Sequence, residues 1–257
     1  MNAPILFDRS HWGCIRITGA DRVRFLHNQT TNNIEQLKEG QGCHTVFVTS
    51  TGRTIDLASV YALPDALLLT VSPGMAKQLY DWMDRYIFFS DKVTLADESE
   101  QSCLFTLLGE GADTVMTSVG SSALVSQPEF THQIVTLPSA QIEILAAVGS
   151  DLAIPGYTFL GKREDAARLQ KALVAAGATV GSTEQWESLR ILQGRPMPAQ
   201  ELTEDDIPLE AGLWHCVSFE KGCYIGQETI ARLNTYQGVK KRLWGILLEN
   251  SVEVGTP

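Results

Sequence analysis

The sequence lacks any run of apolar residues long enough to cross a lipid bilayer. A membrane-spanning helix needs about 18 or more consecutive, mostly apolar residues, and no segment of the 257-residue chain approaches that length. Residues 1–19 have neither the basic flank and cleavage site of a secretory signal nor the Arg-rich, Ser-rich composition of a transit peptide. We therefore predict a soluble, cytoplasmic protein with no membrane partner.

Basic residues are scarce relative to acidic ones. The chain has 20 Lys and Arg against 30 Asp and Glu, which gives a formal net charge of −10. A protein that binds nucleic acid without regard to sequence needs clustered positive charge to displace counterions from the phosphates. The charge balance therefore argues against direct DNA binding.

Cysteine is present, but never in a metal-binding or redox spacing. The five cysteines are scattered and no two form a Cys-x-x-Cys pair, so the spacing predicts neither a structural zinc site nor a thioredoxin-type redox pair. Cys14, Cys43 and Cys103 lie in apolar, strand-like segments. We expect these three to be buried as small hydrophobic side chains.

A weak internal repeat predicts two related units. Strand-like residues 14–18 lead into Gly19-Ala20-Asp21, and strand-like residues 103–108 lead into Gly111-Ala112-Asp113. In each copy the Gly permits a sharp turn and the Asp can cap the helix that follows. We predict an α+β protein with two ferredoxin-like-type domains and mainly antiparallel sheets, at residues 1–98 and 99–240.

Apolar periodicity and turn residues place the individual elements. Predicted helices cover residues 21–37 and 164–176, and others begin at Ser72-Pro73, Ser182 and Gln227. Predicted strands cover residues 44–48, 55–61, 66–71, 133–137, 141–148 and 241–249. Gln185 follows Ser182 at the spacing of a capping box, in which the two side chains satisfy each other's backbone amides.

The segment Lys221-Gly222-Cys223-Tyr224-Ile225-Gly226-Gln227-Glu228 carries the strongest chemical signal. Its two glycines allow a tight backbone and the close approach of a ligand. Cys223 lies just before a predicted helix N-terminus and two residues after Lys221, and both features would stabilise a thiolate. The same residues also fit a glycine-rich turn with a buried structural cysteine, so residue types leave both interpretations open.

This octapeptide resembles the signature of the YgfZ family, whose eukaryotic relatives assist mitochondrial iron–sulfur cluster maturation. Residues 19–32 and 208–213 are similar to other segments of the same superfamily, which includes the aminomethyltransferase of the glycine cleavage system. The resemblance implies two related α+β domains and a small C-terminal β-barrel around an opening that binds tetrahydrofolate or a derivative. Residues 241–257 would then be the truncated beginning of that barrel.

The resemblance also implies which residues form the site. Cys223 is expected to be the reactive residue with Lys221 assisting it, and no metal ligand is expected. The expected folate-binding residues come from the first helix, from one strand and from the octapeptide. They are Arg24, Asn28, Gln29, Asp56, Tyr224, Gly226, Gln227 and Glu228.

Two positions depart from the aminomethyltransferase pattern. The Gly-Gly-x-x-Asp-Asp segment of those enzymes corresponds to residues 52–57, where Leu57 stands in place of the second Asp. Their Arg-x-Glu-Ala-Gly segment corresponds to residues 190–194, where Leu192 replaces the Glu that helps to hold the pterin. Because catalysis depends on placed polar groups, these losses predict poor one-carbon transfer.

Three functional hypotheses follow. The leading one is an accessory protein that binds tetrahydrofolate and supports the assembly or repair of iron–sulfur client proteins through Cys223, with an indirect effect on tRNA modification. The alternative is a folate-dependent aminomethyl or methyl transferase, or a demethylase, so enzymatic activity stays open at this stage. The third, a cysteine hydrolase that uses Cys223 and His215, has only residue types behind it.

Overall fold

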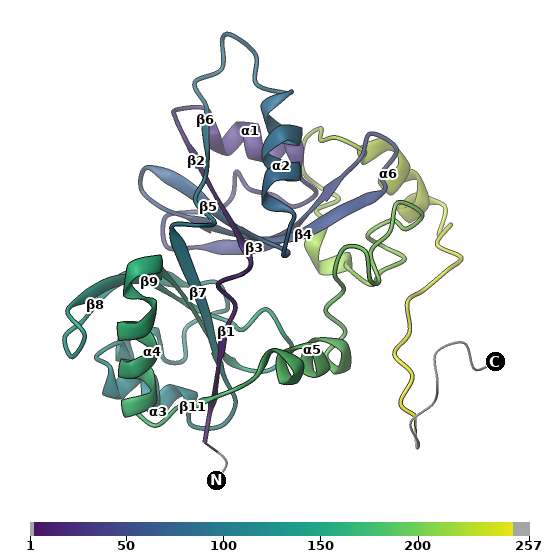
Figure 1. Cartoon of the computed structure of the whole chain (residues 1–257). Helices are drawn as coiled ribbons and strands as arrows, with labels where there is room; N and C mark the ends of the chain where they lie inside the picture. Colours follow the sequence, from purple (N-terminus) through teal and green to yellow (C-terminus); the bar gives the residue numbers. More distant parts are fainter. Residues whose placement is uncertain (1–2, 249–257) are drawn as a thin grey trace.

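The computed structural model describes residues 3–248 and contains two β-sheets. The first has five strands in the order β3-β4-β5-β2-β6, and the second has six in the order β11-β1-β7-β10-β9-β8. Apart from the parallel β1–β11 pair, the strand pairs are antiparallel. The predicted α+β class with two mainly antiparallel sheets is therefore confirmed (Figure 1).

The first sheet comes from one continuous segment of the chain. Its strands are β2 (Gly13–Thr18), β3 (Gly42–Val48), β4 (Thr54–Ala62), β5 (Ala66–Val71) and β6 (Thr94–Asp97). Helices α1 (Arg22–Gln29) and α2 (Ala76–Asp84) pack against one face of it. Their shared core includes Ile15, Leu26 and Leu79, all without exposed surface.

The second sheet is completed by a strand from the start of the chain. Its strands are β1 (Ile5–Asp8), β7 (Ser102–Leu108), β8 (His132–Leu137), β9 (Ile142–Val148), β10 (Gly156–Lys162) and β11 (Thr179–Val180). β1 lies between β7 and β11, although it precedes the whole first sheet in sequence. The predicted domain boundary between residues 98 and 99 stays a prediction. The structure shows in addition that the N-terminal strand β1 pairs with strands of the second sheet.

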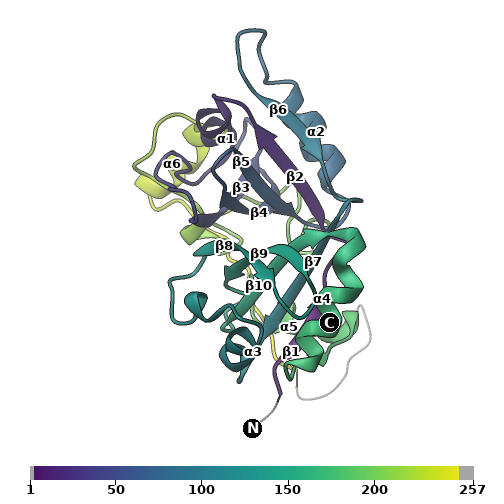
Figure 2. The same cartoon turned by 90° about the vertical axis from the view of Figure 1, so that its left-hand side faces the viewer.

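Helices cover the second sheet as they cover the first. α3 (Ala112–Ser118) and α4 (Ala166–Ala175) pack on one face around Met116, Leu169 and Leu173. Short 3-10 helices lie at Ser122–Leu124 and Arg163–Asp165. Figure 2 shows the two units one above the other, with α3 and α4 beside the second sheet. Within residues 3–248 the structure contains no helix of the length and apolarity that a membrane span requires.

The segment from Leu202 to Val239 packs against the other face of the first sheet. It includes the 3-10 helix η3 (Trp214–Cys216) and α6 (Gln227–Thr235), whereas α5 (Thr183–Leu192) packs beside β1 of the second sheet, where Trp186 meets Phe7. Val46 and Leu57 of the sheet form a core with Leu209 and Ile230 of this segment. Both faces of the first sheet are therefore buried.

The helix predicted over residues 21–37 is shorter than expected. α1 ends at Gln29, and Thr30 has extended backbone angles and forms an isolated β-bridge with Phe47 of β3. A β-branched residue with a strand partner gains more from pairing than from continuing a helix. The long helix was wrong because this tertiary contact is invisible to local periodicity.

Helix starts were predicted more accurately than this helix end. Ser182 caps α5 in a capping box with Gln185, and α6 begins at Gln227, so both predicted starts are confirmed. The helix predicted from Ser72-Pro73 begins only at Ala76, because Gly74 has a φ of +78°, which no right-handed helix accommodates.

The strand predicted at residues 241–249 is wrong for residues 241–248. Leu243 N donates to Glu210 O at 2.9 Å, but no strand among residues 3–248 pairs with the segment. A strand needs a neighbour to satisfy its backbone groups. Residues 249–257 lie outside the described residues, so the barrel start predicted at 241–257 is not observed in the described part.

Alternation along β3 and β4 decides which side chains face the second unit. Ala58 and Val60 of β4 point into the helix-covered core, so Ser59 and Tyr61 point to the opposite face. On β3, His44 lies two residues from Val46 and shares that opposite face by the same rule.

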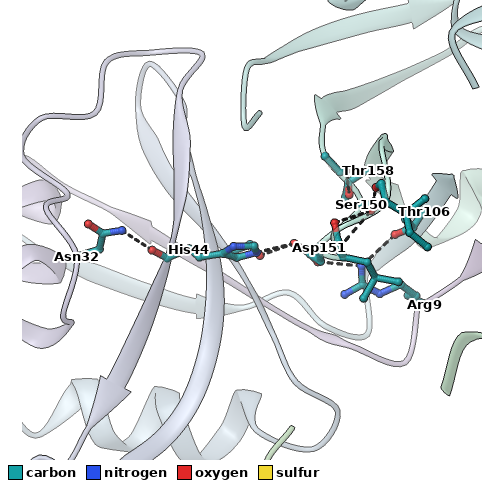
Figure 3. Close-up of polar contacts among 11 residues, drawn as sticks. Arg9, Asn32, His44, Thr106, Ser150, Asp151 and Thr158 are labelled. Carbon is teal, nitrogen blue, oxygen red and sulfur yellow. Dashed lines mark hydrogen bonds and ion pairs between the residues drawn. The ribbon is translucent and has the colours of Figure 1, made fainter. Parts of the chain in front are cut away.

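A buried ion pair of the second unit lies at this face and is shared with side chains of the first sheet. Arg9 Nη1 donates to Asp151 Oδ2 at 2.8 Å and to Thr106 Oγ1 at 3.0 Å. The other carboxylate oxygen of Asp151 accepts a hydrogen bond from Ser59 Oγ at 2.8 Å and lies 3.1 Å from His44 Nε2. Figure 3 shows His44 reaching from the first sheet toward Asp151 of the second unit.

The guanidinium of Arg9 also lies against two indole rings. Its central carbon is 3.8 Å from the ring centroid of Trp12 and 4.4 Å from that of Trp186. Burial alone would raise the pKa of Asp151, but the charge of Arg9 and the hydrogen bond of His44 hold that pKa well below its ordinary value. The stabilisation from this ionised carboxylate is therefore present above the ordinary pKa of Asp and is lost as pH falls through the lowered one.

We predict that Arg9→Met lowers the free energy of unfolding by about 3–5 kcal/mol, because it leaves the charge of Asp151 buried without its guanidinium partner. Urea unfolding at neutral pH measures the difference. The matched control is Arg16→Met, which breaks an ion pair with Glu98 whose side chains are both 32% exposed. The control should cost about 1 kcal/mol or less, and equal losses in the two variants would contradict the importance of the buried pair.

Candidate functional site

A cavity of about 540 Å³ lies between α1, the segment that follows α2, and the loop that precedes α6. We call it the α1 pocket. Its lining residues are Asp21, Arg24, Phe25, Asn28, Gln29, Tyr86, Phe88, Asp91, Cys223, Tyr224 and Ile225. The volume is within the range of roughly 300–1,000 Å³ that is usual for small-molecule sites. A larger hollow of about 740 Å³ lies between the two units, but it contains none of the predicted site residues.

Helical spacing on α1 builds one wall of the pocket. Residues three or four apart lie on the same face of a helix, so Arg24 and Asn28 are neighbours, as are Phe25 and Gln29. Arg24 Nη2 lies 3.4 Å from Asp21 Oδ1 and 3.6 Å from Asp91 Oδ1. These two carboxylates orient the largely exposed guanidinium at the rim.

Gln29 brings an unsatisfied acceptor to the pocket. The residue is 5% exposed, and within residues 3–248 its Oε1 has no hydrogen-bond partner. Buried polar atoms nearly always have a partner, and an unpaired one costs roughly 1–3 kcal/mol. A ligand that donates a hydrogen bond at this point would remove that penalty.

The octapeptide loop forms the opposite wall. Ile225 N donates to Asn28 O at 3.1 Å, which ties the loop to the last turn of α1. Tyr224 is buried with one side toward the pocket, whereas Cys223 is exposed. The thiol therefore lines the cavity and can be reached from solvent.

The other four cysteines differ from Cys223, and the structure describes all five. Burial raises the pKa of Cys14 and Cys103 to about 11 and that of Cys43 and Cys216 to about 12. These four remain protonated near neutral pH and react poorly, because the thiolate is the nucleophile.

Lys221 points to the end of α1. Its Nζ donates to the carbonyl oxygens of His27, Thr30 and Asn32, the last two at 2.7 Å. A cation at a helix C-terminus complements the partial negative charge there. No hydrogen bond joins Lys221 to Cys223 in the part of the chain that the structure describes. Lys221 therefore holds the loop on α1, and the expected contact with the thiol is not formed.

Opposing effects act on the charge of Lys221. Burial lowers the pKa of Lys221 to about 7, although the nearby Glu35 opposes that change. The three carbonyl acceptors favour the ammonium form, since each accepts one hydrogen bond and an ammonium group has three N–H donors.

The last three residues of the octapeptide support the local fold of the loop and of α6. Gly226 has a φ of +81°, and a Cβ there would lie 2.5 Å from Thr49 O, so a larger residue does not fit. Gln227 Nε2 donates to Gly222 O at 3.3 Å. Glu228 lies in the first turn of α6, where a negative charge is favourable. None of the three lines the α1 pocket.

Asp56 is also away from the pocket. It is fully buried, and its carboxylate accepts hydrogen bonds from Leu57 N at 2.8 Å and Ser72 N at 2.9 Å. Burial raises the pKa of Asp56 to about 6 against these hydrogen bonds. Leu57 is buried and Leu192 is 64% exposed, and neither lines the pocket.

The structure thus brings half of the predicted residues together. Arg24, Asn28, Gln29, Cys223 and Tyr224 surround one pocket, whereas Asp56, Lys221 and residues 226–228 lie outside its lining. The sequence reasoning missed Phe25, Tyr86, Phe88 and Asp91 as pocket residues. Phe25 could have been found from its helical spacing to Gln29, but nothing in the local sequence places the segment after α2 beside α1.

The family of this chain follows from comparison with known proteins. Residues 1–221 match the family model described as the GCVT N-terminal domain. The chain belongs to this family. The superfamily part of the resemblance is therefore confirmed, and the narrower assignment to the YgfZ branch stays a prediction.

Individual relatives agree with this assignment. “Putative transferase At1g60990, chloroplastic” of Arabidopsis thaliana is 46% identical over 255 residues, which cover 99% of this chain and 59% of that protein. The aminomethyltransferase of Shouchella clausii is 30% identical over 251 residues, covering 95% and 67%. That of Halalkalibacterium halodurans is 28% identical over 257 residues, covering 98% and 68%. The chain therefore spans about 59% of the length of the Arabidopsis relative.

A solved structure shares the fold. The glycine cleavage system aminomethyltransferase T from Bartonella henselae superposes with a TM-score of 0.79 at 18% identity, covering 91% of this chain and 64% of that one. At this identity the likeness supports the two-unit α+β architecture alone.

We predict that a thiol reagent labels Cys223 first at neutral pH, because it is exposed and the other thiols have raised pKa values. Labelling of the native protein followed by peptide mass spectrometry should give one fast equivalent at Cys223. Cys223→Ser should abolish that phase. A fast phase that survives in this variant would show that the assignment of accessibility is wrong.

We further predict that Lys221→Met lowers the free energy of unfolding by about 3 kcal/mol or more, because it leaves buried carbonyls at the end of α1 without donors. Urea unfolding measures the loss. The control is Lys77→Met, a lysine whose side chain is 82% exposed, which should cost about 0.5 kcal/mol or less. If Lys221→Met were instead fully stable and Cys223 reacted more slowly in it, Lys221 would act on the thiol as first predicted.

Proposed function

We propose that the α1 pocket binds tetrahydrofolate or a derivative, and that the chain takes part in the transfer of a one-carbon unit on that folate. Family membership supports an aminomethyltransferase-like protein, since two of its relatives are named aminomethyltransferases. This places the folate-dependent transferase, the alternative drawn from the sequence, ahead of the accessory role.

The buried Oε1 of Gln29 is the observation that carries folate binding. A pteridine ring presents amino and ring N–H donors along one edge, and such an edge would supply the hydrogen bond that Gln29 lacks. Phe25, Tyr86 and Phe88 line the same cavity. Their rings can pack on the faces of a flat heterocycle.

Arg24 suits the other end of a folate. The glutamate tail carries carboxylates, and a guanidinium binds a carboxylate through charge-assisted hydrogen bonds. Arg24 lies at the rim, where its side chain is 61% exposed, so a long tail could reach it while the ring lies deeper.

Cys223 is the reactive side chain in this proposal. Asp56 is enclosed and hydrogen-bonded to backbone, and Leu57 has no acidic group. The pocket carboxylates of Asp21 and Asp91 are engaged by Arg24. The Cys223 thiol lines the cavity without such a partner in the described chain, so it is the group that can approach a bound one-carbon unit.

A second candidate function rests on the exposure of the same thiol. An exposed thiolate can also bind iron or sulfur species brought by a partner, since soft thiolates are the ligands of iron–sulfur clusters. Support of iron–sulfur client proteins, with an indirect effect on tRNA modification, would use Cys223 in this way. Folate binding is common to both candidates, and turnover separates them.

We predict that Gln29→Leu weakens tetrahydrofolate binding by about tenfold or more, equivalent to roughly 1.4 kcal/mol. The variant should be at least as stable as the wild type without ligand, because it removes an unsatisfied buried oxygen. Anaerobic titration calorimetry measures affinity and thermal unfolding measures stability. The control, Gln133→Leu, changes an exposed glutamine of β8 and should leave affinity unchanged. Unchanged affinity in Gln29→Leu would exclude the pocket as the pterin site.

Cys223→Ser separates the two candidate functions. It should retain folate affinity, because serine keeps the shape of the pocket. If the chain transfers one-carbon units, incubation of the wild type with methylene-tetrahydrofolate and an amine acceptor should give turnover that this variant lacks. No turnover by the wild type, together with low iron–sulfur enzyme activity in cells that carry Cys223→Ser, would favour the second candidate.

A further inference from the structure

Three side chains outside the α1 pocket form a compact group of metal-ligand types. His44 of β3 meets His215 and Cys216 of η3, and one ligand atom from each lies within 4.8 Å of the other two. The imidazole rings of the two histidines are 6.0 Å apart between centroids and inclined by 73°. None of the three residues lines the α1 pocket.

The fold brings these residues together from distant parts of the sequence. His44 points away from the helix-covered core because it alternates with Thr45 along β3, as described above. η3 lies on that face, and Thr31 Oγ1 donates to Cys216 O at 2.6 Å, which fixes the position of η3 beside the end of α1. The group is therefore held by backbone contacts on both sides.

A carboxylate already orients one of the imidazoles. His44 Nε2 lies 3.1 Å from Asp151 Oδ1, and the side chain of Asp151 is 2% exposed. A buried carboxylate accepts the Nε2 proton, so His44 Nδ1 is left with a free lone pair. Histidines that bind metals usually have a carboxylate or carbonyl partner of this kind on the second nitrogen. Arg9 and Ser59 in turn hold Asp151, as Figure 3 shows for Arg9.

The ligand set has a recognisable chemistry. Two imidazoles and one thiolate suit zinc and other late first-row transition metals, whereas magnesium and calcium require oxygen ligands. Sites with three protein ligands keep a further position for water or substrate. Here His215 is exposed while Cys216 is fully buried, so the open position would face solvent on the side of His215.

We propose that His44, His215 and Cys216 bind one divalent transition-metal ion of the zinc type, with Asp151 as the partner that orients His44. This site is separate from the folate pocket and does not depend on the proposed function. Metal binding displaces the thiol proton of Cys216, which is released to solvent.

The test uses Co²⁺ as a spectroscopic probe on the chelator-treated full chain, followed by competition with Zn²⁺. One equivalent of Co²⁺ should give the visible bands of a tetrahedral ion and an intense near-ultraviolet band from the cobalt–thiolate bond, and Zn²⁺ should displace it. His215→Ala should weaken Co²⁺ binding at least about tenfold. Even the loss of a residue that only hydrogen-bonds to a metal ligand costs about tenfold in affinity. Cys216→Ser should remove the thiolate band.

Two controls make the outcome decisive. Cys223→Ser removes the exposed thiol and should leave the spectrum unchanged, and loss of the thiolate band in this variant would mean that Co²⁺ binds adventitiously at Cys223. If Cys216→Ser does not fold, His215→Ala still decides the matter, because its side chain lies at the surface and circular dichroism can confirm its fold. A folded His215→Ala protein with wild-type Co²⁺ affinity overturns the proposal, as does the absence of a stoichiometric complex in the wild type.

Discussion

The ion pair between Arg9 and Asp151 is the constraint on which the relation of the two units depends. Both side chains are almost fully buried, and the pair joins the end of β1 to the loop between β9 and β10 within the second unit. Its second oxygen is shared with Ser59 and His44 of the first sheet. A buried charged group tolerates little displacement. Its attraction to the partner charge compensates for the lost hydration, and this attraction weakens as the two groups move apart. The two sheets are therefore held in one relative position by a polar contact within an otherwise apolar layer.

That apolar layer explains why the central strands β4, β5, β7 and β10 are almost entirely buried. Tyr61 and Leu68 of the first sheet meet Leu104 and Leu145 of the second in a common cluster. These central strands thus have helices on one face and other protein on the other, and they lack the alternating polar face of a solvated antiparallel sheet. The near-continuous apolar runs of β4 and β5 follow from this arrangement.

Much of this architecture could be predicted from the sequence, and the exceptions have a common cause. The repeated Gly-Ala-Asp after a strand indicated two α+β units, although neither Asp21 nor Asp113 makes the predicted capping hydrogen bond. The capping box of α5 was predicted correctly because it depends on local sequence. The premature end of α1 and the lack of a strand at residues 241–248 depend on whether a distant strand offers a partner. Nothing in the local sequence predicts that β1 pairs with the second sheet and not with the first.

The site shows the same division. The resemblance supplied Arg24, Asn28, Gln29 and Tyr224 as binding residues, and the residue types around Cys223 had already indicated a reactive thiol. The direction of Lys221 could not be predicted, because its ammonium is taken up by the open carbonyls at the end of a helix some 190 residues earlier in the chain. Likewise Asp56 was expected to face a ligand, but its carboxylate accepts hydrogen bonds from two backbone amides. Sequence patterns indicated the residue types, and backbone groups from elsewhere decided their orientation.

The position of β1 has a consequence for how the chain reaches this state. The backbone groups of Ile5 and Leu6 can be hydrogen-bonded only after their strand partners have been synthesised. These partners are Leu107 and Leu108, and then Thr179 and Val180. During synthesis all strands of the first sheet are made before β7, while the leading residues remain without a neighbour. Such long-range closure is slow. Shortening the leading segment would therefore remove a strand from the sheet that is made last, while the strand pairs of the first sheet stay complete.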